Sequence, residues 1–322
     1  MDSATRKRLW AVVQLAFVAA AFWFVGAAVA RQWGDVRHSL GAVHPAWGLV
    51  SLSGVLVLSS YALLIQTWRV MLESWGGRPF PYRSATRIWF VSNLGKYVPG
   101  KVWQITAMSA LAQREGISPV AATGSALVIN LANILSGFVL VLGGGLRLLD
   151  TATGGHSSTA IAIAAVLLSG LLLLPVLLPR VAAIAARLTG RDVVVPRLAA
   201  RPVWLATLGT AAAWLLYGLA FAALARSVLP GVRGSLADAV AVYTISYLAG
   251  YLFVPAPGGL GVREWTMVQG ITTLGLASQG DAWVLAFASR LWLTVLEVLP
   301  GALFILFGGL RRAPINLHVD PT

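Results

Sequence analysis

Two lysines flank a proline–glycine pair in the segment Lys96-Tyr97-Val98-Pro99-Gly100-Lys101, and they are two of only three lysines in the chain. Proline removes a backbone donor and disfavours helix in the residue before it, so a helix arriving here must break near Val98. The helix that restarts near Lys101 points its positively polarised end at the break, where an anion such as a phosphate is favoured. Lys96, Tyr97 and Lys101 are therefore candidate ligands, and Pro99 and Gly100 form the hinge. Alternatively, both lysines extend to the membrane surface and only anchor the hinge.

A second hinge is predicted at Pro255-Ala256-Pro257-Gly258-Gly259-Leu260-Gly261, which holds two prolines and three glycines. Such a run permits a sharp turn and a close approach of the backbone to a ligand. Arg263 and Glu264 follow in an apolar setting, where a charge costs about 2.5–3.5 kcal/mol to insert and usually has a function. Substrate binding and a structural contact between the hinges both explain these two charges. The glycine run does not resemble a nucleotide-binding loop, because it lacks the Gly-Lys-Ser/Thr ending and follows no predicted strand.

Arg290 and Glu297 lie seven residues apart in the apolar run Trp283–Phe307, so they share one face of the predicted helix. Charged side chains inside a membrane face the interior of the helix bundle. We expect these two to pair with Glu264 and Arg263 of the second hinge. Such pairs would serve either as a packing element or as part of a substrate site.

The composition indicates a membrane protein. Of the 322 residues, 58% are apolar and 11% are charged, and the mean hydropathy is +0.79, whereas soluble domains carry roughly 25% charged residues. The absence of cysteine excludes disulfides, thiolate metal sites and cysteine nucleophiles. The net charge of +13 comes from basic residues between apolar runs, which indicates cytoplasmic loops rather than nucleic-acid binding.

Six apolar runs are long enough to cross a hydrocarbon core of ~30 Å, which takes about 20 helical residues. They are Leu9–Ala30, Ala46–Thr67, Val120–Leu146, Ala160–Leu178, Val203–Ala225 and Trp283–Phe307. The first exceeds the about 7–15 apolar residues of a signal peptide, so we expect a retained anchor. Asn130 and Asn133 are predicted to form interhelical hydrogen bonds. Tryptophans at span ends are predicted interfacial anchors: Trp10, Trp33, Trp47, Trp68, Trp204 and Trp283.

Two further apolar regions are interrupted by the hinges. The arms of the first are Ala85–Val98 and Lys101–Ala112, and the arms of the second are Ala237–Val254 and Leu260–Leu276. If each region enters and leaves on one side, the most basic loops all face the cytoplasm, and the arginines outside are Arg31, Arg37, Arg147, Arg226 and Arg233. If the first region crossed the membrane, the arginine-rich loop Arg180–Arg201 would face outward, against the positive-inside rule. The sequence therefore predicts two re-entrant hairpins, with both termini in the cytoplasm.

The order span, span, hairpin, span then occurs twice, over residues 9–146 and 160–308, beginning on opposite sides of the membrane. In secondary transporters with such inverted repeats, the substrate site lies where broken helices meet near the membrane midplane. We expect one transmembrane domain over residues 1–322 and no soluble domain. Its fold class is an all-α polytopic membrane protein with six spanning helices and two re-entrant helical hairpins in an inverted repeat.

Both hinges resemble the signature stretches of the lysylphosphatidylglycerol synthase transmembrane family. The matching stretches are Gly95–Lys101 and Pro257–Glu264, and the resemblance covers nearly the whole chain. It implies a multi-pass protein of the bacterial cytoplasmic membrane, with re-entrant helices, that moves polar lipids between leaflets. The family includes two-part enzymes with a soluble aminoacyl-transferase domain, which is missing from this sequence, so lysyl-lipid synthesis is not expected. Other members are associated with glycosylated polyprenyl lipids and hopanoids.

We expect a flippase or scramblase for an anionic or glycosylated polar lipid, either a phospholipid or a polyprenyl-phosphate glycolipid. Lys96, Lys101 and Arg263 would bind the headgroup, and Glu264 and Glu297 would balance or select its charge. Two alternatives stay open: a membrane-embedded lipid-modifying enzyme, and a non-catalytic partner of a glycosyltransferase or synthase. The enzyme would need a nucleophile beside a general acid or base, but the histidines lie in loops or the tail. No catalytic residue, cofactor or metal is predicted. A homo-oligomer or a complex with a lipid-synthesising enzyme is compatible with the sequence.

Overall fold

The computed structural model describes residues 45–97, 102–144, 200–229, 231–253 and 256–308, together with isolated residues between 30 and 43 and between 162 and 184. All regular elements in these ranges are helical. The predicted spans Leu9–Ala30 and Ala160–Leu178 lie outside the continuously described ranges and stay predictions.

Four long helices correspond to four of the predicted spans, and each is long and apolar enough to cross a membrane. They are α3 (Trp47–Gly76), α6 (Pro119–Gly144), α9 (Ala200–Val228) and α12 (Gln279–Gly308). Helix α3 continues well past the predicted end at Thr67, because Met71 and Leu72 extend its buried face. It ends at Gly77, which adopts a left-handed conformation and donates its N–H to the Glu73 carbonyl at 3.0 Å.

Shorter helices flank the two predicted hinges. Around the first are α4 (Tyr82–Asn93), the 3₁₀ turn η1 (Leu94–Tyr97) and α5 (Val102–Arg114); around the second are α10 (Leu236–Leu252), η2 (Pro257–Gly259) and α11 (Val262–Thr273). The start of α10 is fixed by a capping box between Ser235 and Asp238. In each group the two helices pack against each other, so each hinge is the tip of a helical pair.

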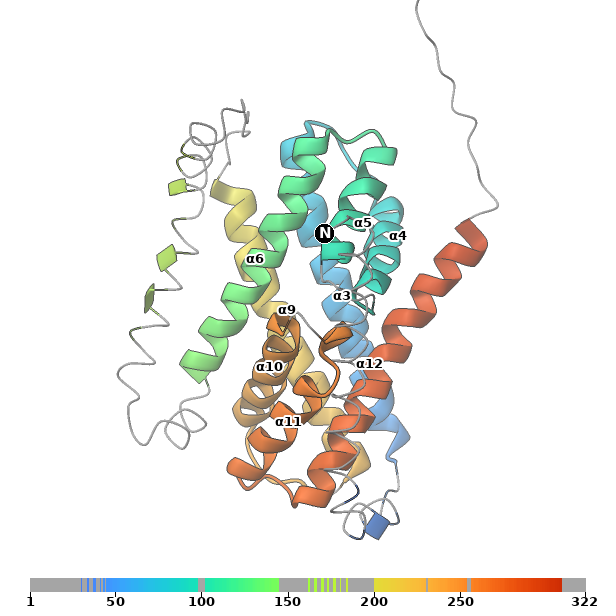
Figure 1. Ribbon diagram of the computed structural model, residues 1–322, viewed down its shortest axis with the longest axis vertical. Helices are drawn as coiled ribbons and strands as arrows, with labels where there is room; N and C mark the ends of the chain where they lie inside the picture. Colours follow the sequence, from blue (N-terminus) through green and yellow to red (C-terminus); the bar gives the residue numbers. More distant parts are fainter. Residues whose placement is uncertain are drawn as a thin grey trace, which may run out of the picture.

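The two helical pairs approach each other from opposite halves of the molecule, with α4 and α5 in the upper half of Figure 1 and α10 and α11 in the lower half. Their tips, η1 and η2, are in contact. Helices α3 and α9 pack side by side, and the Ala46 N–H donates to the Ser227 carbonyl at 3.0 Å where one begins and the other ends. Helix α12 contacts α4 of the first helical pair and α11 of the second, so it links the two pairs.

The tryptophans divide into two groups that the sequence did not distinguish. Trp47 and Trp204 are largely exposed, in keeping with interfacial anchors. Trp68 and Trp283 are fully buried, so the prediction that they anchor the protein at the membrane surface is wrong. Trp68 instead donates its indole N–H to the Ser125 hydroxyl of α6 at 3.2 Å and fixes the packing of α3 on α6.

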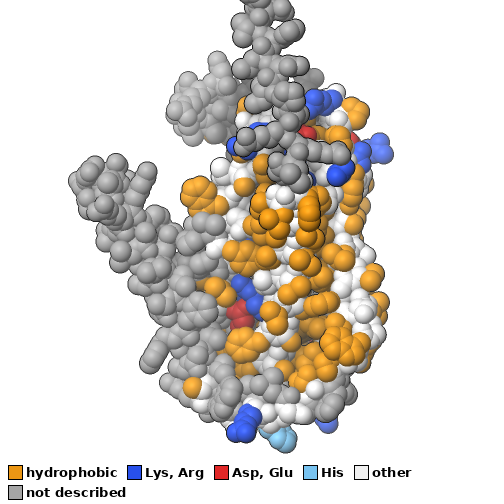
Figure 2. All heavy atoms as spheres, turned by 90° about the vertical axis from the view of Figure 1, so that its right-hand side faces the viewer, with side chains coloured by type: hydrophobic (Ala, Val, Ile, Leu, Met, Phe, Trp, Pro, Cys, Tyr) orange, Lys and Arg blue, Asp and Glu red, His pale blue; other side chains and the backbone are white. Residues whose placement is uncertain are grey.

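Hydrophobic side chains cover the middle of the face shown in Figure 2, and lysine and arginine side chains lie toward its two ends. Much of the exposed apolar surface belongs to α12, including Leu291, Leu299 and Leu306. A helix that presents large apolar residues outward and charged residues inward is suited to a lipid environment. A small group of basic and acidic side chains is visible within this apolar face.

Candidate functional site

The two hinges meet at Tyr97 and Gly258. A methyl group added to Gly258 would lie 3.4 Å from the Tyr97 ring, so the glycine backbone packs directly on the aromatic side chain. Gly258, Gly259 and Gly261 have φ angles of 57°, 70° and 84°, which lie in the region that favours glycine. The glycine run therefore folds the second tip tightly enough to bring it against the first.

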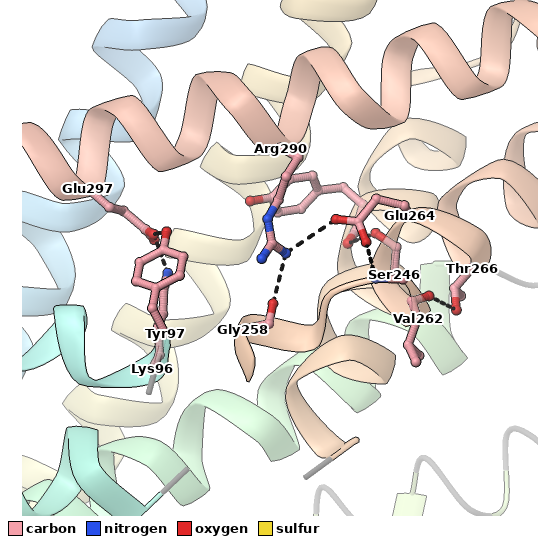
Figure 3. A network of polar contacts seen from close by, with 11 residues as sticks. Lys96, Tyr97, Ser246, Gly258, Val262, Glu264, Thr266, Arg290 and Glu297 are labelled. Carbon is pink, nitrogen blue, oxygen red and sulfur yellow. Dashed lines mark hydrogen bonds and ion pairs between the residues drawn. The ribbon is translucent and has the colours of Figure 1, made fainter. Parts of the chain in front are cut away.

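Glu297 of α12 holds the first hinge. Its carboxylate forms an ion pair with Lys96 and accepts hydrogen bonds from the Tyr97 hydroxyl at 3.0 Å and the Tyr61 hydroxyl of α3 at 2.5 Å. Only 3% of the Glu297 side chain is exposed. Three donors around one buried carboxylate compensate for its loss of hydration, and they connect α3, η1 and α12 at one point. Figure 3 shows the contacts of Lys96 and Tyr97 with Glu297.

Arg290, also on α12, holds the second hinge. Its guanidinium donates to the Gly258 carbonyl at 2.8 Å and lies 3.3 Å from the Glu264 carboxylate (Figure 3). The other oxygen of Glu264 accepts the backbone N–H of Gly261 at 2.7 Å, which caps the start of α11. The predicted pairing of Arg290 with Glu264 is therefore confirmed.

The predicted pairing of Glu297 with Arg263 is wrong. Glu297 forms its ion pair with Lys96, and Arg263 forms no ion pair with any residue that the structure describes. The Arg263 guanidinium instead lies beside two aromatic rings of α10, 5.4 Å from the Tyr243 ring centroid and 5.0 Å from that of Tyr247. Arg263 is 6% exposed, and its Nη2 has no hydrogen-bond partner in the part of the chain that the structure describes. Helical spacing could not identify which cation would face Glu297 across the hinge.

These side chains surround a small cavity between the hinge tips and α12, with about 30 Å³ of water-accessible space. Among the described residues, three cations line it: Lys96, Arg263 and Arg290. Lys96 and Arg290 are each neutralised by a carboxylate, whereas Arg263 is not. The cavity thus has an excess of positive charge, and an anion such as a phosphate would be bound there by charge-assisted hydrogen bonds.

Several predicted site residues cannot be placed. Lys101, Pro99, Gly100 and Pro255 lie outside the described residues, and so does the side chain of Pro257. The structure therefore brings together six of the predicted ligands: Lys96, Tyr97, Arg263, Glu264, Arg290 and Glu297.

Three tyrosines that were not predicted form the aromatic part of the site. Tyr243, Tyr247 and Tyr251 occur every four residues, and their rings stack along one face of α10 with centroid distances of 6.3 and 6.4 Å. That spacing was the signal that could have identified them. The predicted interhelical bond of Asn130 is confirmed, because its side-chain oxygen accepts from Tyr251 at 2.9 Å. The Asn133 backbone carbonyl accepts from the Trp214 indole at 2.8 Å, and its side chain makes no hydrogen bond to a described residue.

No group of three or more potential metal ligands occurs among the residues described. A family model described as the lysylphosphatidylglycerol synthase TM region matches residues 11–305, which include both hinges, helices α3, α6 and α9, and all but the last turn of α12. No curated protein matches the chain.

Proposed function

The chain belongs to the lysylphosphatidylglycerol synthase transmembrane family, and we propose that it moves a polar lipid with an anionic headgroup between the two leaflets of the membrane. The observation that carries this proposal is Arg263, a buried cation at the cavity wall that pairs with no carboxylate of the described chain. The family membership supports a membrane function related to lipids. The activity itself is inferred from the site.

An unpaired cation in a buried position is costly, because it loses hydration without gaining an ion pair. Stacking on Tyr243 and Tyr247 offsets about 0.5–2 kcal/mol of that cost. A lipid phosphate at this point would supply the missing negative charge and would accept a hydrogen bond from the unpartnered Nη2. Lys96 and Arg290 lie on the same cavity and would share the phosphate if their carboxylate partners were displaced.

The short helical pairs support a re-entrant topology. Helix α4 has 12 residues and α5 has 13, which at 1.5 Å per residue gives only about 18–20 Å. Neither is long enough to cross a hydrocarbon core of ~30 Å, which supports a pair that enters and leaves the membrane on one side. We propose that the two pairs enter from opposite leaflets, within an inverted repeat of residues 9–146 and 160–308.

Helix α12 supplies a mechanism for alternating access. Glu297 attaches it to the first tip and Arg290 attaches it to the second, seven residues away on the same helix. Loss of one attachment while the other is kept would open the cavity toward one leaflet at a time. A headgroup phosphate can drive that change, because it competes with Glu297 for Lys96 and with Glu264 for Arg290.

The basic end of the molecule is proposed to face the cytoplasm. Glu115, just after α5, forms an ion pair with Arg87 of α4 and accepts a hydrogen bond from Arg78 through its carbonyl. Arg83 and Arg114 lie at the ends of the same two helices. This concentration of arginine fits the positive-inside rule and would place both chain termini in the cytoplasm of a bacterial cell.

Reconstitution into vesicles tests the proposal. Purified protein should speed the exchange of a fluorescent anionic phospholipid between leaflets, followed by quenching of the outer leaflet. Arg263→Gln should slow that movement at least about tenfold, because a charge-assisted hydrogen bond contributes about 1.5–3 kcal/mol. Arg263→Lys keeps the charge and should retain part of the activity. Arg226→Gln is the matched control, since Arg226 is exposed and lies away from the cavity.

Failure to exceed empty vesicles with any anionic lipid would refute the proposal. Mass spectrometry of the recovered lipid separates transport from the alternative of a lipid-modifying enzyme, because a transported lipid keeps its mass. A protein that changes the lipid mass without moving it would be an enzyme instead.

A further inference from the structure

A groove at the basic end of the molecule lies between the start of α4 and the end of α12. It has about 470 Å³ of water-accessible space, compared with about 30 Å³ in the central cavity. Small-molecule sites in proteins usually measure about 300–1,000 Å³, so the groove is large enough for a ligand. Among the described residues, the groove and the cavity have no lining residue in common, and they are therefore two separate sites.

Tight packing between α4 and α12 separates the groove from the cavity. A methyl group added to Gly301, one turn beyond Glu297 on α12, would lie 3.0 Å from the Phe90 carbonyl oxygen and 3.1 Å from the Leu94 side chain. Close to this contact, the Phe304 ring stacks on the Phe90 ring with centroids 6.3 Å apart. Figure 1 shows α12 slanting away from α4 toward its C-terminal end. A ligand in the groove is thus kept apart from the cavity in which we place the transported headgroup.

The α4 wall of the groove is basic. Arg83 and Arg87 are four residues apart, so they lie on one face of the helix. Arg87 is ion-paired with Glu115, whose other carboxylate oxygen accepts a hydrogen bond from the Ser84 hydroxyl at 3.3 Å. Arg83 is exposed and forms no ion pair with any residue that the structure describes. The described wall therefore carries one uncompensated positive charge, which would attract an anion.

The α12 wall of the groove is apolar. The Leu303 side chain is 43% exposed and the Phe307 side chain 69% exposed. Both belong to a helix that is long and apolar enough to cross a membrane, so their exposed surface suits contact with acyl chains. The groove thus joins a cationic wall and an apolar wall at one end of the membrane-spanning bundle.

A ligand that fits both walls has an anionic group and an acyl chain. Free phosphate would leave the apolar wall uncovered, and a neutral lipid would leave Arg83 without a counter-ion. A headgroup with a net positive charge would find the one carboxylate of the groove already paired with Arg87. Basic pockets between membrane helices on the cytoplasmic side bind the headgroups of anionic phospholipids.

We propose that the groove holds one anionic phospholipid that is not transported, with its phosphate at Arg83 and Arg87 and an acyl chain along the apolar α12 wall. This lipid would join α4 to the last turns of α12 and would stabilise the helix that holds both hinge tips. Its binding does not depend on the proposed transport. Its assignment to the cytoplasmic leaflet follows from the orientation proposed above.

Lipid retention by the full-length protein tests the proposal. The protein is placed in nanodiscs of equal amounts of phosphatidylglycerol and phosphatidylcholine, and native mass spectrometry counts the lipids that stay bound after release. Phosphatidylglycerol should be retained at least about fivefold over phosphatidylcholine, which is the effect of one basic residue near the membrane surface. Arg83→Gln should lower that preference about fivefold, and Arg83→Lys should keep it. Arg114→Gln is the matched control, since Arg114 is exposed at the same end of the molecule and does not line the groove.

Melting temperatures in detergent distinguish a lipid from a free phosphate. Short-chain phosphatidylglycerol should raise the melting temperature, whereas glycerol phosphate at the same concentration should not, because only the lipid reaches the apolar wall. The shift should be smaller in Arg83→Gln than in Arg114→Gln. It should also be smaller in Phe307→Gln, a change at a largely exposed side chain that leaves the packed core untouched. Equal shifts with lipid and glycerol phosphate would overturn the proposed lipid site.

The remaining outcomes separate this inference from the proposed transport. Equal retention of phosphatidylglycerol in Arg83→Gln and Arg114→Gln would overturn the inference alone. So would a wild-type protein without any lipid preference, which would mean that another occupant, such as residues 309–322, fills the groove. Lipid movement slowed as much in Arg83→Gln as in Arg263→Gln would make the groove part of the transport path and overturn the resident lipid. Retention of phosphatidylglycerol without lipid movement would refute only the proposed transport.

Discussion

Lys96 at the first hinge is ion-paired with Glu297 on α12, and the two residues are 201 positions apart in the chain. The carboxylate side of this pair is 3% exposed and the ammonium side 15%, so the pair lies largely inside the protein. A contact of this kind ties the first half of the chain to its last helix, and its removal should affect both stability and access to the cavity.

Glu297→Gln should destabilise the protein by about 3–5 kcal/mol, because removal of one partner leaves the other charge buried and unpaired. Thermal unfolding in detergent, followed by size-exclusion chromatography, measures the effect. The double variant Lys96→Met with Glu297→Gln should recover part of the loss, because it removes both charges. A single variant as stable as wild type would show that Lys96 gains nothing from this carboxylate.

Gly259→Ala should be far more damaging than Gly275→Ala. Both glycines have positive φ, 70° and 62°, so each alanine carries a backbone cost of about 1–2 kcal/mol. A methyl group on Gly259 would also lie 2.6 Å from the backbone of Gly250 on α10, whereas one on Gly275 would meet nothing within 4 Å. Yield of folded protein and melting temperature give the comparison. Equal losses in the two variants would show that the second hinge tolerates separation from α10.

Tyr243→Phe should leave stability unchanged or raise it by up to about 1 kcal/mol, because it removes a buried hydroxyl that has no hydrogen-bond partner among the described residues. Tyr243→Leu should lower stability, since it removes the ring beside the Arg263 guanidinium along with contacts to Tyr217 and Phe221. Melting temperatures of the two variants test this. If Tyr243→Phe lowered the melting temperature as much as Tyr243→Leu, the hydroxyl rather than the ring would be the stabilising group.

The helices and hinges were predictable from the sequence because they depend on local chemistry. Apolar runs identify α3, α6, α9 and α12, and the proline and glycine clusters identify the breaks before α5 and α11. Helical spacing also indicates that Arg290 and Glu297 face the interior together. These features need only the period of a helix and the conformational limits of proline and glycine.

The partners of the buried charges were not predictable in the same way. Glu297 pairs with Lys96 rather than Arg263 because the order of groups around the cavity depends on how α12 is rotated against both tips. The contact of Arg263 with Tyr243 and Tyr247 was also not predictable, because a tyrosine in an apolar helix usually only packs against its neighbours. The fully buried Trp68 and Trp283 show the same limit: position at a span end does not tell whether a side chain faces lipid or protein.

The two helical pairs should enter the membrane from opposite sides, and introduced cysteines can show it because the chain has none of its own. Gln113 at the end of α5, Arg201 at the start of α9 and Gln279 at the start of α12 are all exposed. Single cysteines at Gln113 and Arg201 should react with a membrane-impermeant maleimide only after the cytoplasmic face is opened. A cysteine at Gln279 should react in intact spheroplasts. Labelling of the Arg201 cysteine from outside would mean that α4 and α5 cross the membrane, and the proposed path between two opposed tips would then be wrong.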